Sequence, residues 1–368
     1  MTKTGFHLLP VAECQQDPAG ATILGFAVPD ALQADFTFLP GQYLTLQAEI
    51  EGAEVRRPYS ICSSPGGGLL QVGIRQIEAG RFSQFARHLK PGDQLSVMPP
   101  QGRFTLKNPK PGQHLLLAAG SGITPILPIA EALLADHPDC SVMLIWGNRQ
   151  RSSIMLKEAV DGLKNRFMGR FSLLHILSRE AGDQPLFSGR LDAARLRQLS
   201  EAGLFDASQL AEAWICGPAE MSADCLAWLG EQGMAQKDLH TEVFTPAPPS
   251  RQKGQIKGPA SAQDRAAKPA AADSQPACTV RVILDGAEQE FPLPDGLSVI
   301  EAAREARISL PWSCANGMCA TCRCRLTSGA GQMQQNFSLD AAELEAGFVL
   351  ACQLIPQSPH LTLDFDQS

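Results

Sequence analysis

Short runs of alternating apolar and polar residues mark the first part of the chain. Two of these runs, residues 43–47 and 94–98, lie between turn signals such as Pro40-Gly41 and Pro91-Gly92. Alternation with a period of two predicts strands that bury one face, and closely spaced turns are typical of antiparallel sheets. We therefore expect a small antiparallel β-barrel or sandwich, and we assign residues 1–107 to it.

The next part of the chain shows a different pattern, in which apolar strands alternate with helical segments. The predicted strands are residues 114–118, 142–146, 171–177 and 213–216, and the predicted helices are residues 125–134, 153–164, 192–199 and 219–232. Strands that alternate with helices predict a parallel sheet whose crossover connections are helical. We expect an α/β domain with a parallel sheet over residues 108–246.

Residues 247–277 have the composition of a linker between two complete bodies. These 31 residues contain nine alanines and five prolines but no aromatic residue, so they cannot bury a core. A flexible chain of this length spans roughly 30 Å on average, so we expect that the flanking bodies can reorient. After the linker, a predicted hairpin, helix and final strand indicate a small α+β domain over residues 278–368.

The net charge and the cysteine content exclude several classes of function. The net charge is −7, which gives no electrostatic footprint for nucleic acid. The apolar stretches are far shorter than the ~20 residues of a membrane span, and the N-terminus lacks the pattern of a secretion signal. We therefore expect a cytoplasmic protein without nucleic-acid binding or membrane insertion. The 11 cysteines, an odd number, favour metal binding over disulfide bonds.

Four cysteines near the C-terminus carry the strongest chemical signal. Cys314, Cys319 and Cys322 form a C-x4-C-x2-C motif, and Cys352 follows after 29 residues. This spacing is typical of plant-type [2Fe–2S] clusters, in which four thiolates hold two irons. A structural zinc site is the alternative, although zinc sites more often pair their cysteines as C-x2-C twice. The region resembles the plant-type ferredoxin family, which implies a β-grasp fold with these four cysteines as the metal ligands.

A glycine-rich turn joins the first strand of the α/β region to its first helix. Residues 116–125 run from an apolar strand through Gly120 and Gly122 into a helix that begins near Thr124. Glycines let the backbone approach a phosphate, and a helix N-terminus supplies N–H donors. The turn indicates a dinucleotide site, but it lacks the complete G-x-G-x-x-G pattern, so alone it does not exclude an ordinary turn.

Three more motifs join this turn in a recognisable order. They are Arg57-Pro58-Tyr59-Ser60, Gly80-Arg81-Phe82-Ser83 and Cys216-Gly217-Pro218. Together with the glycine-rich turn, they resemble the ferredoxin–NADP reductase superfamily over residues 1–246. The resemblance implies a β-barrel that binds a flavin, followed by an α/β domain that binds a nicotinamide dinucleotide.

The resemblance also implies roles in flavin binding. Tyr59, in the Arg57-Pro58-Tyr59-Ser60 segment, would stack on the isoalloxazine ring, Arg57 would pair with a phosphate, and Ser60 would bond near N5. A second set of donors would cradle the pyrophosphate at a helix start, which implies FAD rather than FMN. This second set comprises Gly80, Phe82 and Ser83. Each of these motifs also has a purely structural explanation, such as a core tyrosine or a surface arginine.

The end of the α/β region resembles the same superfamily. Glu242-Val243-Phe244 is similar to the Glu-x-aromatic ending of these reductases. Phe244 would shield the flavin until the nicotinamide displaces it, and Glu242 would relay a proton or tune the flavin. A plain strand end is the alternative. The candidate catalytic residues are therefore Ser60, Cys216 and Glu242, with Gly217 as a cofactor-binding neighbour.

The choice between NADPH and NADH depends on the residues that follow two predicted strands. Arg149 follows the strand at 142–146, with no acidic residue before Glu158. Ser178 and Arg179 follow the strand at 171–177 and resemble the superfamily's pair for a 2′-phosphate. Glu180 could instead accept hydrogen bonds from a ribose diol. The pattern favours NADPH and leaves NADH open.

The complete arrangement resembles the reductase components of bacterial oxygenases, including the reductase subunits of phenylacetyl-CoA epoxidases. It implies that electrons pass from NADPH through FAD and a [2Fe–2S] cluster to an external oxygenase or another metalloprotein, with aromatic catabolism as a setting. The reductases of hybrid-cluster proteins, steroid hydroxylases and acyl desaturases remain alternatives. A non-catalytic, zinc-stapled binding module is a more distant one.

Overall fold

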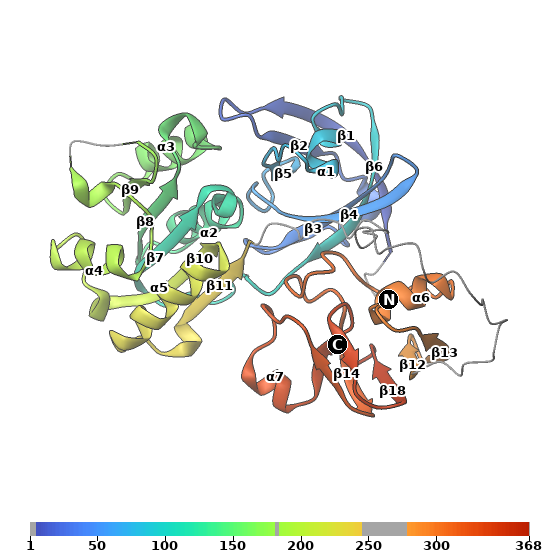
Figure 1. Ribbon diagram of the computed structural model, residues 1–368. Coiled ribbons are helices and arrows are strands. Elements are labelled where there is room, and N and C mark those ends of the chain that lie inside the picture. Colours follow the sequence, from blue (N-terminus) through green and yellow to red (C-terminus); the bar gives the residue numbers. More distant parts are fainter. Residues whose placement is uncertain (1–4, 181–183, 245–277, 368) are drawn as a thin grey trace, which may run out of the picture. The chain divides into compact units, whose positions relative to one another are not determined.

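The chain divides into two compact units. The computed structural model describes residues 5–180, 184–244 and 278–367, so the predicted linker at 247–277 lies outside the described residues. The first unit is Met1–Thr245 and the second is Pro246–Ser368. Both units are shown in Figure 1, where the colours follow the sequence.

Six antiparallel strands build the first half of the first unit. Their order is β4-β3-β6-β1-β2-β5, and a bridge between Ile61 and Val72 connects β5 back to the end of β4. The sheet is therefore closed into a barrel around apolar side chains such as Leu24, Leu46 and Val72. The strands are β1 (His7–Gln16), β2 (Thr22–Phe26), β3 (Tyr43–Ile50), β4 (Ala53–Ser60), β5 (Leu70–Ile74) and β6 (Gln94–Gln101). The 3-10 helix η1 (Asp30–Leu32) and α1 (Arg81–Ala86) lie in its connections.

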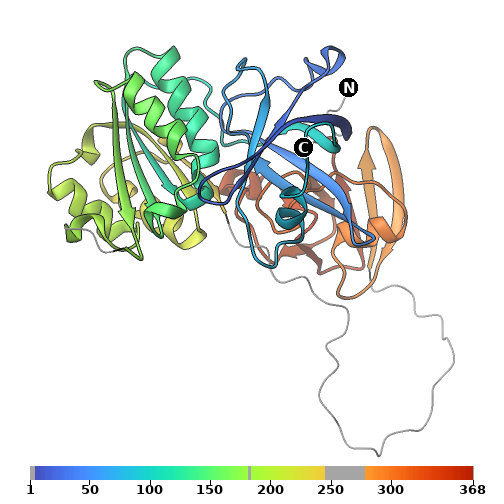
Figure 2. The ribbon, with the colours of Figure 1, turned by 90° about the horizontal axis from the view of Figure 1, so that it is seen from above.

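The second half of this unit is a parallel five-stranded sheet with helices on both faces (Figures 1 and 2). Its order is β11-β10-β7-β8-β9, and every neighbouring pair is parallel. The strands are β7 (Gly112–Ala119), β8 (Cys140–Asn148), β9 (Phe171–Leu177), β10 (Leu210–Gly217) and β11 (Leu239–Val243). The helices are α2 (Ile123–Asp136), α3 (Lys157–Arg166), α4 (Ala193–Glu201) and α5 (Ala219–Glu231), with 3-10 turns η2 (Gly120–Gly122), η3 (Arg151–Ser153), η4 (Pro185–Phe187), η5 (Ala207–Gln209) and η6 (Gln236–Asp238).

Alternate residues of the central strand supply two separate cores. Leu116 and Ala118 of β7 pack in one core with the apolar faces of α2 and α3. Leu115 and Leu117 pack in the other core with α4 and α5. A strand that is buried on both faces reads as a continuous apolar run, which explains why residues 114–118 carry no polar alternation.

The second unit is a mixed sheet with a helix packed on it. Its order is β13-β12-β18-β14-β16, in which β12 and β18 are parallel and the other pairs are antiparallel. The elements are β12 (Cys278–Leu284), β13 (Ala287–Leu293), α6 (Val299–Glu305), β14 (Arg323–Ser328), β15 (Gly331–Met333), α7 (Ala341–Glu345), β16 (Phe348–Leu350), β17 (Leu354–Pro356) and β18 (His360–Asp364). Val299 and Ala303 of α6 are buried in the sheet's core, as in a β-grasp fold. The predicted classes of all three regions are confirmed.

The α3 helix begins later than its sequence pattern predicts. Residues 151–153 form the 3-10 turn η3, and Leu156 then takes a left-handed conformation with φ of 57°. The Leu156 N–H donates to Asp17 Oδ2 of the barrel at 2.8 Å. This contact is distant in sequence, so local periodicity could not reveal it.

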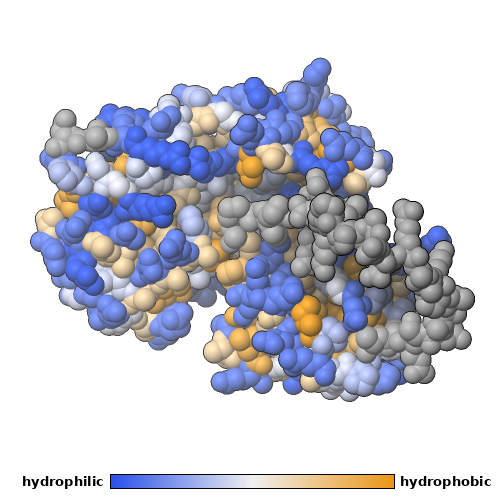
Figure 3. Space-filling view, in the orientation of Figure 1, coloured by the Kyte–Doolittle hydropathy of each residue, from blue (hydrophilic) through white to orange (hydrophobic). Residues whose placement is uncertain are grey.

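The visible face of each unit is largely hydrophilic, and apolar side chains appear there only in small groups (Figure 3). Large exposed apolar residues such as Ile77 and Met168 occur in different elements. Within the described ranges, no helix is both long and apolar enough to cross a membrane.

Candidate functional site

Two motifs of the barrel meet beside Tyr59. β4 carries Arg57 through Ser60, and α1 follows Gly80. The rings of Tyr59 and Phe82 lie 5.6 Å apart between centroids, so the two motifs form one surface. Burial raises the pKa of the Tyr59 phenol, although the nearby Arg57 charge opposes the shift. The phenol therefore stays neutral, as an aromatic ring that stacks on a flavin should.

The start of α1 has a close approach that only glycine allows. A Cβ on Gly80 would lie 2.5 Å from Ser83 Oγ. The Ser83 hydroxyl donates to the Gly80 carbonyl at 2.9 Å and accepts from the Ile77 N–H at 3.2 Å. The first helical bond is Gln84 N–H to the Gly80 carbonyl, so the N–H groups of residues 81–83 precede it. A phosphate would therefore use backbone donors here, while the Ser83 hydroxyl holds the turn. These donors fit a flavin pyrophosphate.

The three predicted catalytic residues come from two domains and meet at one oxygen. The Ser60 hydroxyl donates to Glu242 Oε2 at 3.3 Å, although the two residues are 182 positions apart. Cys216 Sγ lies 4.0 Å from the same oxygen, and Cys216 pairs with Glu242 across β10 and β11. Burial, and then the charge of Glu242, raise the pKa of Cys216 well above its ordinary value of 9.0. Cys216 is therefore a protonated thiol.

The glycine-rich turn abuts this group. A Cβ on Gly122 would lie 2.1 Å from the Cys216 carbonyl oxygen, so any larger residue would displace backbone. Trp146 Nε1 donates to the Gly120 carbonyl at 3.2 Å, and the Thr124 hydroxyl donates to the Ser121 carbonyl at 3.0 Å. These bonds fix the turn at the carboxyl edge of the sheet, where α/β folds bind dinucleotides.

Two more predicted residues, Gly217 and Phe244, lie together at the carboxyl ends of β10 and β11. A Cβ on Gly217 would lie 2.6 Å from Met221 Cε. The Phe244 N–H donates to the Gly217 carbonyl at 2.7 Å, which places the aromatic residue next to the Cys216-Gly217 strand end.

The residues predicted to select the nucleotide lie on adjacent strand ends. The Arg179 N–H donates to the Arg149 carbonyl at 2.8 Å, and the Ser178 N–H donates to the Asn148 carbonyl at 2.9 Å. Glu180, the competing candidate for a ribose, pairs with Arg151 at 3.2 Å and also accepts from its N–H at 2.8 Å. The acidic residue is therefore engaged with a neighbour, whereas Arg149 and Arg179 share one edge.

The four predicted metal ligands form two pairs in the second unit. The Cys314 thiol is hydrogen-bonded to Cys319, and the Cys322 thiol is hydrogen-bonded to Cys352. The bond from Cys314 lowers the pKa of Cys319 to about 6 despite its burial. In the described part of the chain, no three metal-binding side chains converge on a single-ion site. Two pairs of thiols suit two irons better than one zinc ion.

The loop that carries these cysteines directs N–H groups at sulfur. The N–H groups of Asn316 and Met318 each donate to Cys314 Sγ at 3.4 Å. Ala315 and Ala320 adopt positive φ values of 55° and 53°, which non-glycine residues seldom do. The backbone thus wraps tightly around the thiols, and such N–H bonds to sulfur stabilise iron–sulfur clusters. The donor set therefore fits a [2Fe–2S] cluster.

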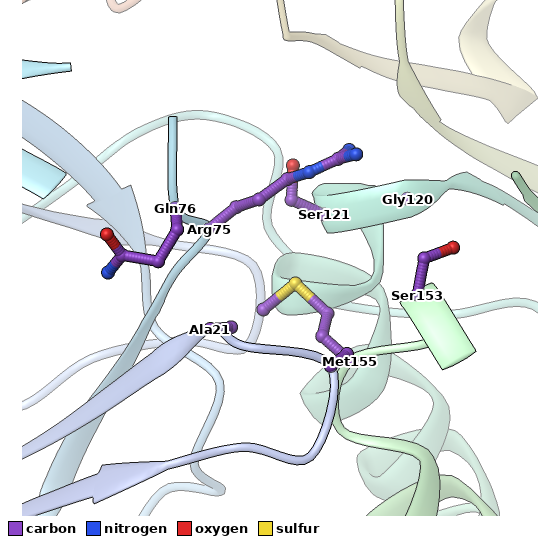
Figure 4. Close-up of a pocket in the computed structure, with 8 residues that line it drawn as sticks. Ala21, Arg75, Gln76, Gly120, Ser121, Ser153 and Met155 are labelled. Atoms are coloured by element: carbon purple, nitrogen blue, oxygen red, sulfur yellow. The ribbon is translucent and has the colours of Figure 1, made fainter. Parts of the chain in front are cut away.

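Sequence patterns alone did not point to two residues of this region. Arg75 follows β5 and lines a pocket beside the glycine-rich turn (Figure 4). Asp17 connects the barrel to the segment before α3. A basic residue at a strand end, five positions before Gly80, was the one local signal for Arg75.

Family models match three successive regions of the chain. Residues 12–106 match the oxidoreductase FAD-binding domain, and residues 116–226 match the oxidoreductase NAD-binding domain. Residues 270–357 match the 2Fe-2S iron-sulfur cluster binding domain, which removes the zinc alternative. The chain is thus an oxidoreductase that uses FAD, a nicotinamide cofactor and a [2Fe–2S] cluster.

Two curated relatives cover almost the entire chain. One subunit of the 1,2-phenylacetyl-CoA epoxidase from Escherichia coli strain K12 is 39% identical over 99% of this chain and 98% of its own length. The ferredoxin reductase component of 3-ketosteroid-9-alpha-monooxygenase from Rhodococcus rhodochrous is 30% identical over 97% of this chain and 96% of its own length.

A solved structure shows the same fold. It is phthalate dioxygenase reductase, described as a modular structure for electron transfer from pyridine nucleotides to [2Fe–2S]. The match has a TM-score of 0.59 at 20% identity and covers 99% of this chain and 100% of that one. The chain therefore belongs to the family of flavin- and [2Fe–2S]-dependent reductase components that these oxygenase proteins represent.

Proposed function

We propose that the chain supplies electrons from NADPH to an external oxygenase component that acts on an aromatic acyl-CoA, as a phenylacetyl-CoA epoxidase does. When bound, FAD supplies hydride acceptance and the [2Fe–2S] cluster supplies one-electron transfer. The choice of acceptor is supported by the 39% identity to a subunit of the 1,2-phenylacetyl-CoA epoxidase. The hydride-transfer step is supported by the convergence of Ser60 from the barrel and Cys216 from the α/β domain on one Glu242 oxygen. A hydride donor and its acceptor need such a meeting point between two binding domains.

The residues at this meeting point have distinct roles in the proposal. Ser60 and Tyr59 hold and orient the flavin ring from β4. Cys216, as a protonated thiol, would lie beside a bound nicotinamide and add no charge of its own. Glu242 holds Ser60 in place and is positioned to take or give a proton. Phe244 would cover one face of a bound flavin.

The phosphate-binding residues divide between the two cofactors. Arg57 and the N–H groups after Gly80, including those of Phe82 and Ser83, hold the flavin phosphates. Gly120, Gly122 and Thr124 form the turn that receives the nicotinamide dinucleotide.

Selection of NADPH is assigned to the edge formed by Arg149, Ser178 and Arg179. Engagement of Glu180 with Arg151 supports this choice, because a carboxylate already paired is less available to a ribose diol.

The second unit delivers electrons to the acceptor. Cys314, Cys319, Cys322 and Cys352 are the proposed iron ligands. Residues 278–368 carry 11 acidic and 5 basic residues, a net charge of −6, which favours a basic docking face on the acceptor. None of the 11 cysteines forms a disulfide in the structure, which fits a reducing cytoplasm.

The acceptor is tested by reconstitution. The purified holoprotein is mixed with NADPH and, in turn, with a phenylacetyl-CoA epoxidase, a 3-ketosteroid hydroxylase or a hybrid-cluster protein. We expect coupled NADPH oxidation and product formation with the epoxidase, at a rate well above that with the other two. Equal or better support of another acceptor would overturn the assignment, while Cys352→Ser should abolish coupling with all three.

A further inference from the structure

Gln353, the residue after the last predicted iron ligand, is a buried amide. It is 7% exposed, and its neighbours Leu350 and Leu354 are fully buried in the core of the second unit. A buried amide costs free energy unless its polar atoms find partners, whereas a leucine or methionine would fill the same space without that requirement. The contacts of the amide must therefore account for its presence.

The Nε2 atom of Gln353 carries two hydrogens and has three acceptors within reach. It donates to the Ala315 carbonyl at 2.9 Å, to the Cys352 carbonyl at 3.1 Å and to Cys352 Sγ at 3.7 Å. The bond to Ala315 uses one hydrogen, so the carbonyl and the sulfur of Cys352 share the other. One side chain thus joins the loop that carries Cys314 to the segment that carries Cys352.

The same side chain packs against the cysteine loop. A Cβ on Gly317 would lie 3.2 Å from Gln353 Cγ, and Ala315 adopts a left-handed conformation with φ of 55°. Asn316, between these two residues, donates its N–H to Cys314 Sγ at 3.4 Å. Gln353 therefore contacts the loop on both sides of a residue whose N–H already donates to a thiol.

The donors to the cysteine sulfurs are of two kinds. Backbone N–H groups, such as that of Met318 toward Cys314, are present whichever side chain the residue carries. Side-chain donors depend on the residue type. The Thr321 hydroxyl donates to Cys319 Sγ at 3.1 Å in one pair of thiols, and the Gln353 amide serves the other pair. Each pair thus has a side-chain donor that a substitution can remove while the backbone donors stay.

We propose that Gln353 is a positioning residue for electron transfer, whose amide N–H donates to the Cys352 sulfur and raises the reduction potential of the [2Fe–2S] cluster. This inference rests on the proposed ligand role of Cys352. Reduction adds negative charge to the irons and their sulfur ligands, so a hydrogen-bond donor stabilises the reduced state more than the oxidised state. A higher potential makes the cluster a better acceptor for electrons from the flavin.

The test compares Gln353→Met with the wild type, because methionine keeps the length of the side chain and has no donor. The matched control is Gln357→Met, since Gln357 is an exposed glutamine of the same unit whose amide donates to the Gln332 side chain at 3.3 Å. The midpoint potential of the cluster is measured by anaerobic redox titration with electron paramagnetic resonance. Iron content and thermal stability are measured on the same holoproteins.

We expect Gln353→Met to keep two irons per chain and to have a lower midpoint potential. The ratio of reduced to oxidised cluster at a fixed potential should fall roughly three- to tenfold, which corresponds to about 30–60 mV for a one-electron couple. Gln357→Met should titrate as the wild type does.

An unchanged potential in the iron-loaded protein would overturn the inference and leave the amide with the loop contact at Ala315 alone. If Gln353→Met loses the cluster, wild-type protein with 15N in its glutamine side chains decides the matter. Pulsed electron paramagnetic resonance of the reduced cluster should then detect a coupling to nitrogen, and its absence would also overturn the inference. Failure of the ligand assignment is separate, because Cys352→Ser would then keep the cluster spectrum of the wild type.

Discussion

The carboxylate of Glu242 is the point where the two nucleotide-binding domains make polar contact near the proposed chemistry. Its Oε2 accepts from Ser60 at 3.3 Å and lies 4.0 Å from Cys216 Sγ. Glu242→Gln keeps the shape and a hydrogen-bond acceptor but removes the charge. We expect flavin reduction by NADPH to slow by roughly 10²-fold, the lower end of what general acid–base groups contribute, with little change in KM. Stopped-flow absorbance measures this rate.

The exposed Glu231→Gln of α5 is the matched control and should behave as wild type. If Glu242→Gln reduced the flavin at the wild-type rate, the carboxylate would be a structural contact at a strand end.

Arg179 tests the choice of nucleotide. Arg179→Ala should lower kcat/KM for NADPH roughly ten- to a hundredfold, because one charge-assisted phosphate contact contributes about 1.5–3 kcal/mol. NADH should be little affected. Arg197→Ala is the control, since Arg197 is an exposed arginine of α4 outside the proposed nucleotide site. Steady-state kinetics with both nucleotides give the answer, and equal losses would show that Arg179 only supports the fold.

Residues with a fixed spacing could be predicted from the sequence, and residues defined by distant contacts could not. Cys314, Cys319 and Cys322 lie in one loop, so their separation along the chain already reflects the geometry of the site. Arg75 belongs to no comparable motif, because its neighbours at Gly120 and Arg149 come from other elements.

At the scale of elements, strands and helices follow the apolar pattern closely where the core determines them. Residues 171–177 form β9 with the predicted bounds, because its register with β8 is continuous. The start of α3 differs since Leu156 is held in a left-handed conformation by Asp17 of the barrel. Such tertiary contacts override local propensity.

The edge of the parallel sheet opposite the glycine-rich turn contains a buried ionisable group. His114 of β7 is fully buried, bonds to the Lys110 carbonyl at 2.9 Å and lies 3.5 Å from Glu212 of β10. Desolvation lowers the pKa of His114 below its ordinary value of 6.5, although the Lys110 bond and Glu212 oppose this and His137 and His240 add to it. The folded protein therefore holds this histidine in its neutral form.

The free energy of unfolding should consequently decrease as the pH is lowered. Below pH 6.5 the unfolded chain takes up a proton that the folded chain rejects, so the loss begins there and continues down to the lowered pKa, by at most about 1.4 kcal/mol per pH unit. Thermal unfolding is monitored through the flavin fluorescence that appears when the cofactor is released. Between pH 7 and 5, the melting temperature of His114→Gln should decline less than that of the wild type. Parallel declines in both proteins would assign the acid sensitivity to other groups.

At the scale of the whole molecule, the order of three domains could be predicted from the pattern of apolar and polar residues and from the motifs. What the sequence could not provide is the acceptor, because docking depends on the shape of a surface and not on a motif. The composition of residues 247–277 gives a prediction instead. If this segment lets the second unit change partners, deleting half of it should reduce electron delivery to an external acceptor and leave NADPH-to-flavin transfer unchanged.

A shortened protein that supports its acceptor at the full rate would show that no change of partner is needed. The control replaces residues 247–277 with a glycine–serine segment of the original length. It should restore delivery, because it keeps the reach of the tether and alters its sequence.

The central claim is that one chain carries electrons from NADPH through flavin to the cluster. The most direct measurement mixes anaerobic holoprotein with NADPH and follows the flavin and cluster absorbance in a stopped-flow instrument. We predict that the flavin bleaches first and the cluster second, at a rate independent of protein concentration, and that Cys352→Ser retains only the first phase. A cluster that stays oxidised, or one whose reduction accelerates with protein concentration, would contradict the account.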